Sequence, residues 1–228
     1  MKWVQELWTS SGQAILGRAE AVPDAELVLG FGAPARLSAP ETWQRLREQW
    51  PRARIVMCST AGEISGTQVF DDSLALTALR FERTPLRCAE VVLRDGMASA
   101  QAGHDLVQQL LGPGLRHVFV LSDSLKINGS ELVAGMTTAL PAGVSLTGGL
   151  SGDGDRFQRT YVCLDRFDEL PRVAAIGFYG DLTAAVSSPL SPTGWRKQTC
   201  ARPLRASSAH SIRRTFASTR GCEATSTH

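Results

Sequence analysis

The sequence predicts an α/β protein with mixed sheets and flanking helices. Apolar runs rich in β-forming residues alternate with amphipathic helical runs, as is typical of this class. One unit consists of the strand LVLGFG, a helix and the strand IVMCSTAG. A second unit consists of the strand HVFVLSD, a helix and the strand VSLTGGLSG. Two further strands are expected after each unit. The interval from Val28 to Val56 is 28 residues, as is that from Val118 to Leu146. We therefore expect two duplicated β-α-β-β-β halves.

Four helices are expected from apolar residues at helical spacing. Ser38 and Glu41 have the spacing of a capping box, with Pro40 in the first turn. Asn128 and Glu131 have the same spacing before a second helical run. The expected helices span residues 4–16, 38–50, 99–111 and 128–140.

Strands are expected where short runs of β-branched and aromatic residues are bounded by turn residues. Each of the two units should therefore contain a strand on both sides of its helix. The expected strands span residues 27–32, 54–59, 73–81, 87–93, 117–122, 144–148, 157–164, 173–179 and 182–186.

Length and composition are typical of a soluble globular protein. The chain has 228 residues, of which 43% are hydrophobic and 20% charged. No apolar run approaches the roughly 20 residues that span a bilayer, so no membrane partner is expected. The five cysteines are widely spaced without a C-x-x-C pair, which favours neither a disulfide scaffold nor structural zinc. We expect a cytoplasmic protein that holds no metal.

The end of the chain differs from the rest in charge. Residues 187–228 hold seven Lys/Arg and one acid, whereas the remainder holds 17 Lys/Arg and 21 acids. The end is rich in Ser and Arg and has no sustained period of a helix or a strand, so a disordered tail follows a domain at residues 1–186. Its basic residues are not interleaved with aromatic ones that stack bases, which argues against a nucleic-acid partner.

Hydrolase chemistry finds weak support in the motifs. Cys58 follows a strand, but the G-x-S-x-G pattern of a nucleophile turn is absent there. In the Gly149–Asp153 stretch, Asp153 stands where the last glycine belongs. A hydrolase also needs a histidine beside its nucleophile, and the body offers His104 and His117. A cysteine-dependent hydrolase built on Cys58 remains an alternative.

Loop residues after the strands have ligand-binding chemistry. Asp123 ends the HVFVLS strand, where α/β proteins place ligand-binding groups, and Asn128 stands at a helix start. The TGGLSGDG loop lacks the lysine of a phosphate loop, although its backbone N–H groups can form an anion-binding concavity.

Three blocks resemble one known family. CSTAGEI, LSDSLKINGSELVAG and TGGLSGDGDRFQRTYV, in this order, are similar to the signature blocks of the FIST (F-box and intracellular signal transduction) N-terminal domain. The similarity covers roughly residues 27–186. It implies a sensory domain of a signalling pathway that binds small ligands such as amino acids and passes the signal to a downstream protein. The family is not known as an enzyme class, and some relatives are reported as haem-based gas sensors.

The chain departs from the family pattern in three places. Met57 stands where the family usually has glycine, and Ser124 where it often has glycine. After Gly194-Trp195 the chain continues into Arg/Ser-rich sequence, where the family continues into a FIST C-terminal domain. We therefore expect residues 187–228 to be a truncated or frame-shifted remnant.

We expect the loop residues to form one site for an amino-acid-like ligand. Glu63 or Asp123 would hold its ammonium group, and glycine amides with the Asn128 helix start would hold its carboxylate. No cofactor is expected. The alternatives are a packed turn that binds nothing, or a haem site with His104, His117 or Cys58 as axial ligand. The expected ligand-binding residues are Cys58, Thr60, Glu63, Asp123, Asn128, Gly148, Gly149 and Asp153.

Overall fold

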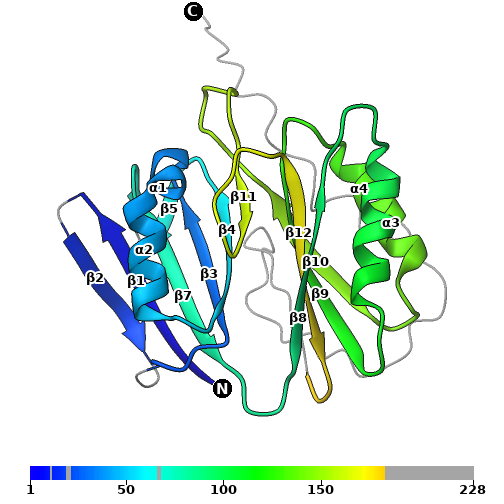
Figure 1. Ribbon diagram of the computed structural model, residues 1–228, viewed down its shortest axis with the longest axis horizontal. Coiled ribbons are helices and arrows are strands. Elements are labelled where there is room, and N and C mark those ends of the chain that lie inside the picture. The colour runs from blue at the N-terminus through cyan, green and yellow to red at the C-terminus, as the bar shows by residue number, and fades with distance from the viewer. Residues whose placement is uncertain (11, 19–21, 66–67, 183–228) are drawn as a thin grey trace, which may run out of the picture.

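Two mixed β-sheets pack face to face, and helices cover their outer faces (Figure 1). The computed structural model describes residues 1–10, 12–18, 22–65 and 68–182. The α/β class with mixed sheets and flanking helices is therefore confirmed. The strand expected at residues 182–186 and the tail at 187–228 lie outside the described residues, apart from Leu182, and the domain boundary between them stays a prediction.

The first sheet has six strands in the order β11-β4-β3-β7-β1-β2. Strands β3 and β4 are parallel, and all its other neighbouring pairs are antiparallel. The strands are β1 (Lys2–Thr9), β2 (Gly12–Arg18), β3 (Leu27–Gly32), β4 (Arg54–Ser59), β7 (Leu74–Arg80) and β11 (Val162–Leu164).

Within the described residues, the second sheet has four strands in the order β10-β9-β12-β8. Strands β9 and β10 are parallel, whereas β12 is antiparallel to both β9 and β8. A separate hairpin of β5 (Glu63–Ser65) and β6 (Gln68–Phe70) follows β4. The strands of the second sheet are β8 (Leu86–Val92), β9 (Leu115–Ser122), β10 (Ser145–Leu150) and β12 (Arg172–Tyr179).

The two sheets contain the same four-stranded arrangement. In order and direction, β4-β3-β7-β1 matches β10-β9-β12-β8. The repeated unit begins one strand earlier than expected, because β8 belongs to the second sheet and is the counterpart of β1. The strand expected at residues 157–164 forms only at Val162–Leu164, and as β11 it pairs with β4 of the first sheet.

The part of the chain that the structure describes contains four helices, α1 (Pro34–Ser38), α2 (Pro40–Gln49), α3 (Ser99–Leu110) and α4 (Gly129–Ala139). The cap predicted for α4 is confirmed, because Asn128 Oδ1 accepts hydrogen bonds from the backbone N–H groups of Ser130 and Glu131. The capping box predicted at Ser38 is wrong. Ser38 ends α1, and α2 begins after Ala39 without a side-chain cap.

The helix expected at residues 4–16 is also wrong, because this segment forms the β1–β2 hairpin. Its Trp and Leu residues at helical spacing gave the helix pattern. In the fold β1 lies between β2 and β7 and pairs with both. Backbone pairing on two sides and burial of Leu7 and Trp8 outweigh the local preference.

The side chains of the strands alternate between an outer and a central core. Met57 packs with the helices of the first half, whereas Cys58 packs between the sheets. Likewise Val120 packs against α3 and α4, and Leu121 packs between the sheets. This period of two gives four layers, helix-sheet-sheet-helix. No helix among the described residues is long and apolar enough to cross a bilayer.

Candidate functional site

The ends of three strands meet between the two halves. The Gly152 N–H, just after β10, donates a hydrogen bond to the Ser59 carbonyl at the end of β4, at 2.7 Å. A Cβ atom at Gly152 would lie 3.2 Å from the backbone nitrogen of Ala61. The Ser151 N–H donates to the Ser122 carbonyl at the end of β9, at 2.8 Å. The two small-residue loops expected to share one place are therefore in contact.

Glu63 is a buried carboxylate held by hydroxyl groups. It is 3% exposed, and the Thr60 and Ser73 hydroxyls each donate to one of its oxygens at 2.5 Å. Each carboxylate oxygen of Glu63 thus has one hydroxyl donor. No basic side chain of the described residues forms an ion pair with it. Glu63 therefore differs from most buried acids, which are paired with a cation.

Asp123 organises the turn after β9. One of its oxygens accepts the backbone N–H groups of Leu125 and Lys126, at 2.9 and 2.7 Å. The other accepts the hydroxyl of buried Thr160 at 2.8 Å. Three donors thus satisfy this buried carboxylate from within the chain.

Asp153 organises the loop after β10 in a similar way. Its oxygens accept Arg156 Nε at 2.8 Å and the backbone N–H groups of Gln158 and Arg159 at 3.2 and 3.1 Å. Burial alone would raise the pKa of this carboxyl, but the bonds from Arg159, Arg156 and Gln158 outweigh it and lower the pKa. Both oxygens of the Asp153 carboxylate therefore accept hydrogen bonds from residues of its own loop.

Ser151 stands out at the meeting point because its hydroxyl has no hydrogen-bond partner among the described residues. The side chain is 4% exposed and lies next to Gly152, which contacts the first loop. Buried hydroxyls are normally paired, because an unpaired one loses its hydration without compensation. Ser151 therefore has hydrogen-bonding capacity that the described residues leave unused.

The two glycines predicted to face a ligand differ in their surroundings. Gly148 has a φ of 155°, and a Cβ atom there would lie 1.8 Å from the Val120 carbonyl oxygen. The absence of a side chain at Gly148 therefore allows β9 and β10 to approach. At Gly149 a Cβ atom would meet none of the described residues within 4 Å. Of the two, only Gly149 has open space beside it.

Cys58 lies in the core between the sheets. Its thiol is buried and donates to the Ser59 carbonyl. Burial first, then the neighbouring Cys163 and Asp123, raise the pKa of this thiol far above its usual range. A nucleophilic cysteine needs a lowered pKa and access to solvent, so these surroundings give a hydrolase little support.

The three residues named as axial haem ligands include two histidines. His117 is buried, and its two ring nitrogens lie 2.7 Å from the Ser145 hydroxyl and 3.0 Å from the Thr147 hydroxyl. His104 is exposed on α3. Among the residues that the structure describes, no three His, Cys, Asp or Glu side chains gather in a way that could hold a metal ion.

Asn128 lies apart from the loop contacts described above. Its printed hydrogen bonds join it to the first turn of α4 and, through its backbone N–H, to the Ser99 hydroxyl at 3.0 Å. It fixes α4 against α3, and none of these bonds reaches Thr60, Glu63 or Asp153.

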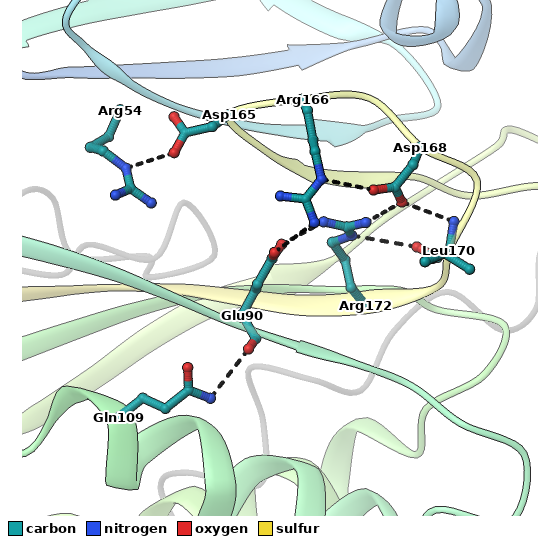
Figure 2. A network of polar contacts seen from close by, with 8 residues as sticks. All are labelled: Arg54, Glu90, Gln109, Asp165, Arg166, Asp168, Leu170 and Arg172. Atoms are coloured by element: carbon teal, nitrogen blue, oxygen red, sulfur yellow. Dashed lines mark hydrogen bonds and ion pairs between the residues drawn. The ribbon is translucent and has the colours of Figure 1, made fainter.

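A charged network is built around Arg172 (Figure 2). Arg172, at the start of β12, is fully buried and donates to Glu90 and Asp168. Arg166 contacts the same two acids at 3.0 and 3.2 Å. The Arg172 carbonyl in turn accepts the Asp123 N–H at 3.0 Å. Two arginines and two acids thus balance one another and hold the backbone at the end of β9.

A second ion pair in the same view joins the halves (Figure 2). Asp165 follows β11, and its carboxylate accepts Arg54 Nε of β4 at 2.8 Å. Arg47 of α2 contacts the same carboxylate at 3.1 Å. The segment between β11 and β12 is thereby attached to the first half before it enters the second sheet.

Sequence reasoning missed three hydroxyls that matter here, namely Ser73, Ser151 and Thr160. Ser151 and Thr160 stand inside the TGGLSGDGDRFQRTYV block, which was a signal for them. Ser73 precedes β7, ten residues after Glu63, and no local pattern marks it.

Fold and loops together define a class: a duplicated α/β domain whose polar residues gather at the carboxyl ends of parallel strands. The model of the FIST N domain family matches residues 26–198, which is more than half of the chain. The chain therefore belongs to the FIST N domain family, and its general role is that of a sensory domain in signal transduction. No curated protein matches the chain.

Proposed function

We propose that this sensory domain binds a small amino-acid-like ligand through Glu63. The observation that carries the proposal is the buried Glu63 carboxylate, which has two hydroxyl donors and no basic partner among the described residues. A buried charge is costly unless a cation compensates it. A ligand ammonium group would supply that cation and would replace or join the Thr60 and Ser73 hydroxyls.

The other end of the ligand would meet the second loop. The hydroxyl of Thr60 donates to Glu63, and the backbone carbonyl carbon of Thr60 lies 3.4 Å from the position of a Cβ atom at Gly152. Ser151 precedes Gly152 and has an unused hydroxyl, and Gly149 has open space beside it. A ligand carboxylate could accept the Ser151 hydroxyl and a backbone N–H of this loop. Such a ligand would contact both halves and change how they pack against each other. A change of this kind suits a sensor.

We propose binding rather than catalysis, because the thiol at Cys58 is buried and its burial raises its pKa. The haem alternative would need a free ring nitrogen or an accessible thiol. Both ring nitrogens of His117 lie beside hydroxyls in the interior, whereas those of exposed His104 lie 3.4 Å from the Asp105 carboxylate and 3.4 Å from the Gln108 amide. A Soret band in the purified protein would favour haem, and ester or amide hydrolysis blocked by iodoacetamide would favour a hydrolase.

The proposal is tested by thermal shift of the full chain across amino acids, followed by calorimetry on the hits. Glu63→Gln should weaken binding of a hit by about ten- to a hundred-fold, because a charge-assisted bond of roughly 1.5–3 kcal/mol is lost. Glu48→Gln is the matched control, since Glu48 is exposed on α2. The deaminated analogue of each hit should not bind. Equal affinity of the Glu63→Gln variant, or binding of deaminated analogues alone, would overturn the proposal.

A further inference from the structure

Glu63 is held by two hydroxyl groups whose surroundings differ. The Thr60 hydroxyl donates to Oε1 of the carboxylate and the Ser73 hydroxyl donates to Oε2, each at 2.5 Å. Ser73 is fully buried, whereas Thr60 is partly exposed. Of the two carboxylate oxygens, Oε1 is therefore the one whose hydroxyl partner is partly accessible to solvent.

Ser73 is fixed to the first sheet. It directly precedes β7, and its backbone carbonyl accepts the Ala33 N–H at 3.0 Å. A Cβ atom at Gly32 would lie 2.7 Å from the same carbonyl oxygen, so the end of β3 packs tightly against Ser73. The Ser73 hydroxyl therefore holds Oε2 from a rigid position, independently of the partner of Oε1.

Thr60 begins the connection between β4 and β5. Residues 60–62 form this connection and belong to no helix or strand. The Thr60 N–H donates to the Gly32 carbonyl at 3.0 Å, which anchors the start of the connection to β3. The hydroxyl bond from Thr60 to Glu63 then joins the two ends of the connection. That bond therefore restrains the shape of residues 60–62.

The same connection touches the second half. The Gly152 N–H donates to the carbonyl of Ser59, directly before the connection, at 2.7 Å. A Cβ atom at Gly152 would lie 3.2 Å from the Ala61 nitrogen and 3.4 Å from the Thr60 carbonyl carbon. A change in the shape of residues 60–62 would therefore alter this contact between the halves.

We propose that the hydrogen bond between Thr60 and Glu63 is a latch that ligand binding opens. The ligand ammonium group takes the place of the Thr60 hydroxyl on Oε1, while Ser73 keeps Oε2. Opening the latch releases residues 60–62 and loosens their contact with Gly152. Such a difference in contacts between two states is what lets a ligand change a conformation. The inference rests on the proposed function for the group that opens the latch, whereas the latch and its contact with Gly152 are properties of the chain itself.

Residue-by-residue hydrogen exchange of the full chain, with no amino acid added, tests the latch. Thr60→Val keeps the shape of the side chain but removes the donor, so the Gly152 amide should exchange roughly tenfold faster. Ser73→Ala is the matched control, because it removes a hydroxyl bond of the same length from the same carboxylate, and it should leave Gly152 nearly unchanged. Thr60→Ser keeps the donor and should behave like the unaltered protein. The β9 amides report any loss of overall stability in each variant.

Calorimetry with the twenty common amino acids tests what opens the latch. An amino acid whose ammonium group competes with the Thr60 hydroxyl should bind Thr60→Val roughly tenfold more tightly than the unaltered protein, because it has no bond to displace. Ser73→Ala should change the affinity by less than about threefold, because Ser73 holds Oε2 in both states.

The outcomes separate the latch from the ligand. Equal exchange of the Gly152 amide in Thr60→Val and Ser73→Ala would overturn the latch, whatever the protein binds. Weaker binding of amino acids to Thr60→Val than to the unaltered protein would show that the hydroxyl helps to hold the ligand, which would overturn the exchange of partners on Oε1. Faster exchange of Gly152 in Thr60→Val alone, without binding of any amino acid, would support the latch and contradict the proposed function.

Discussion

The Thr160 hydroxyl donates a 2.8 Å hydrogen bond to Asp123 Oδ2 across 37 residues of sequence, and both side chains are buried. Asp123 ends the strand β9 of the second sheet. Thr160 precedes Tyr161, whose backbone N–H and C=O both bond to Ser59 of the first sheet. One side-chain pair therefore links the turn after β9 to the segment that attaches to β4.

Replacing Thr160 by valine should destabilise the protein by about 1–3 kcal/mol. The change keeps the shape of the side chain but removes the donor, which leaves one oxygen of buried Asp123 without that bond. Urea unfolding measures the effect. Thr138→Val is the control, because Thr138 is exposed on α4 and its hydroxyl donates to the Ala134 carbonyl within the same helix, not to a buried carboxylate. Equal stabilities of the two variants would show that the bond contributes nothing net.

The two neighbouring glycines of β10 should respond in opposite ways to alanine. Gly148→Ala should cost about 3 kcal/mol or more, because its Cβ would collide with the Val120 carbonyl at a φ unfavourable for alanine. Gly149→Ala should change stability by less than about 1 kcal/mol, because the space beside it is open. Thermal unfolding of the two variants gives the comparison. A stable Gly148→Ala variant would contradict the close approach of β9 and β10.

The protein should lose stability as the pH falls from about 7 to 5. Burial lowers the pKa of His117 below 6.5, so the unfolded chain binds a proton there that the folded chain does not. The contribution of His117 to the free energy of unfolding is fully present above the pKa that it has in the unfolded chain. This contribution declines as the pH falls below that pKa. Urea unfolding at both pH values measures the slope.

The slope should be smaller in His117→Gln, where the buried group no longer titrates. His104→Gln is the control and keeps His117, so it should retain the larger decline. The same pH dependence in His117→Gln and in the unaltered protein would assign the effect to other groups.

Local patterns were enough to predict much of the fold. Asn128 caps its helix because Ser130 and Glu131 supply donors within three residues, and such a contact is readable in sequence. The strand positions at β3, β4 and β9 follow from runs of β-forming residues. The partners of β8 and β11 could not be predicted, because sheet assignment depends on which edge is open after other strands have packed.

The candidate site was predictable in its parts but not in its chemistry. The sequence placed Thr60, Glu63, Asp123 and Asp153 on loops after strands, and the loops of β4 and β10 do meet. It could not show that Asp123 is satisfied by Thr160, because that bond spans 37 residues. Nor could it show that Ser151 has no partner, which depends on the positions of all its neighbours.

The pairing of β11 with β4 has a consequence for synthesis. The first sheet is completed by Val162–Leu164, so it cannot finish folding while only the first half has left the ribosome. At roughly 5–20 residues per second, the about 100 intervening residues take on the order of 5–20 s to be made. During that time the outer edge of β4, with its row of unpaired backbone groups, has no partner from its own chain. A protein fragment that contains the first half alone would keep this edge of β4 uncovered permanently. We expect such a fragment to form insoluble aggregates on expression.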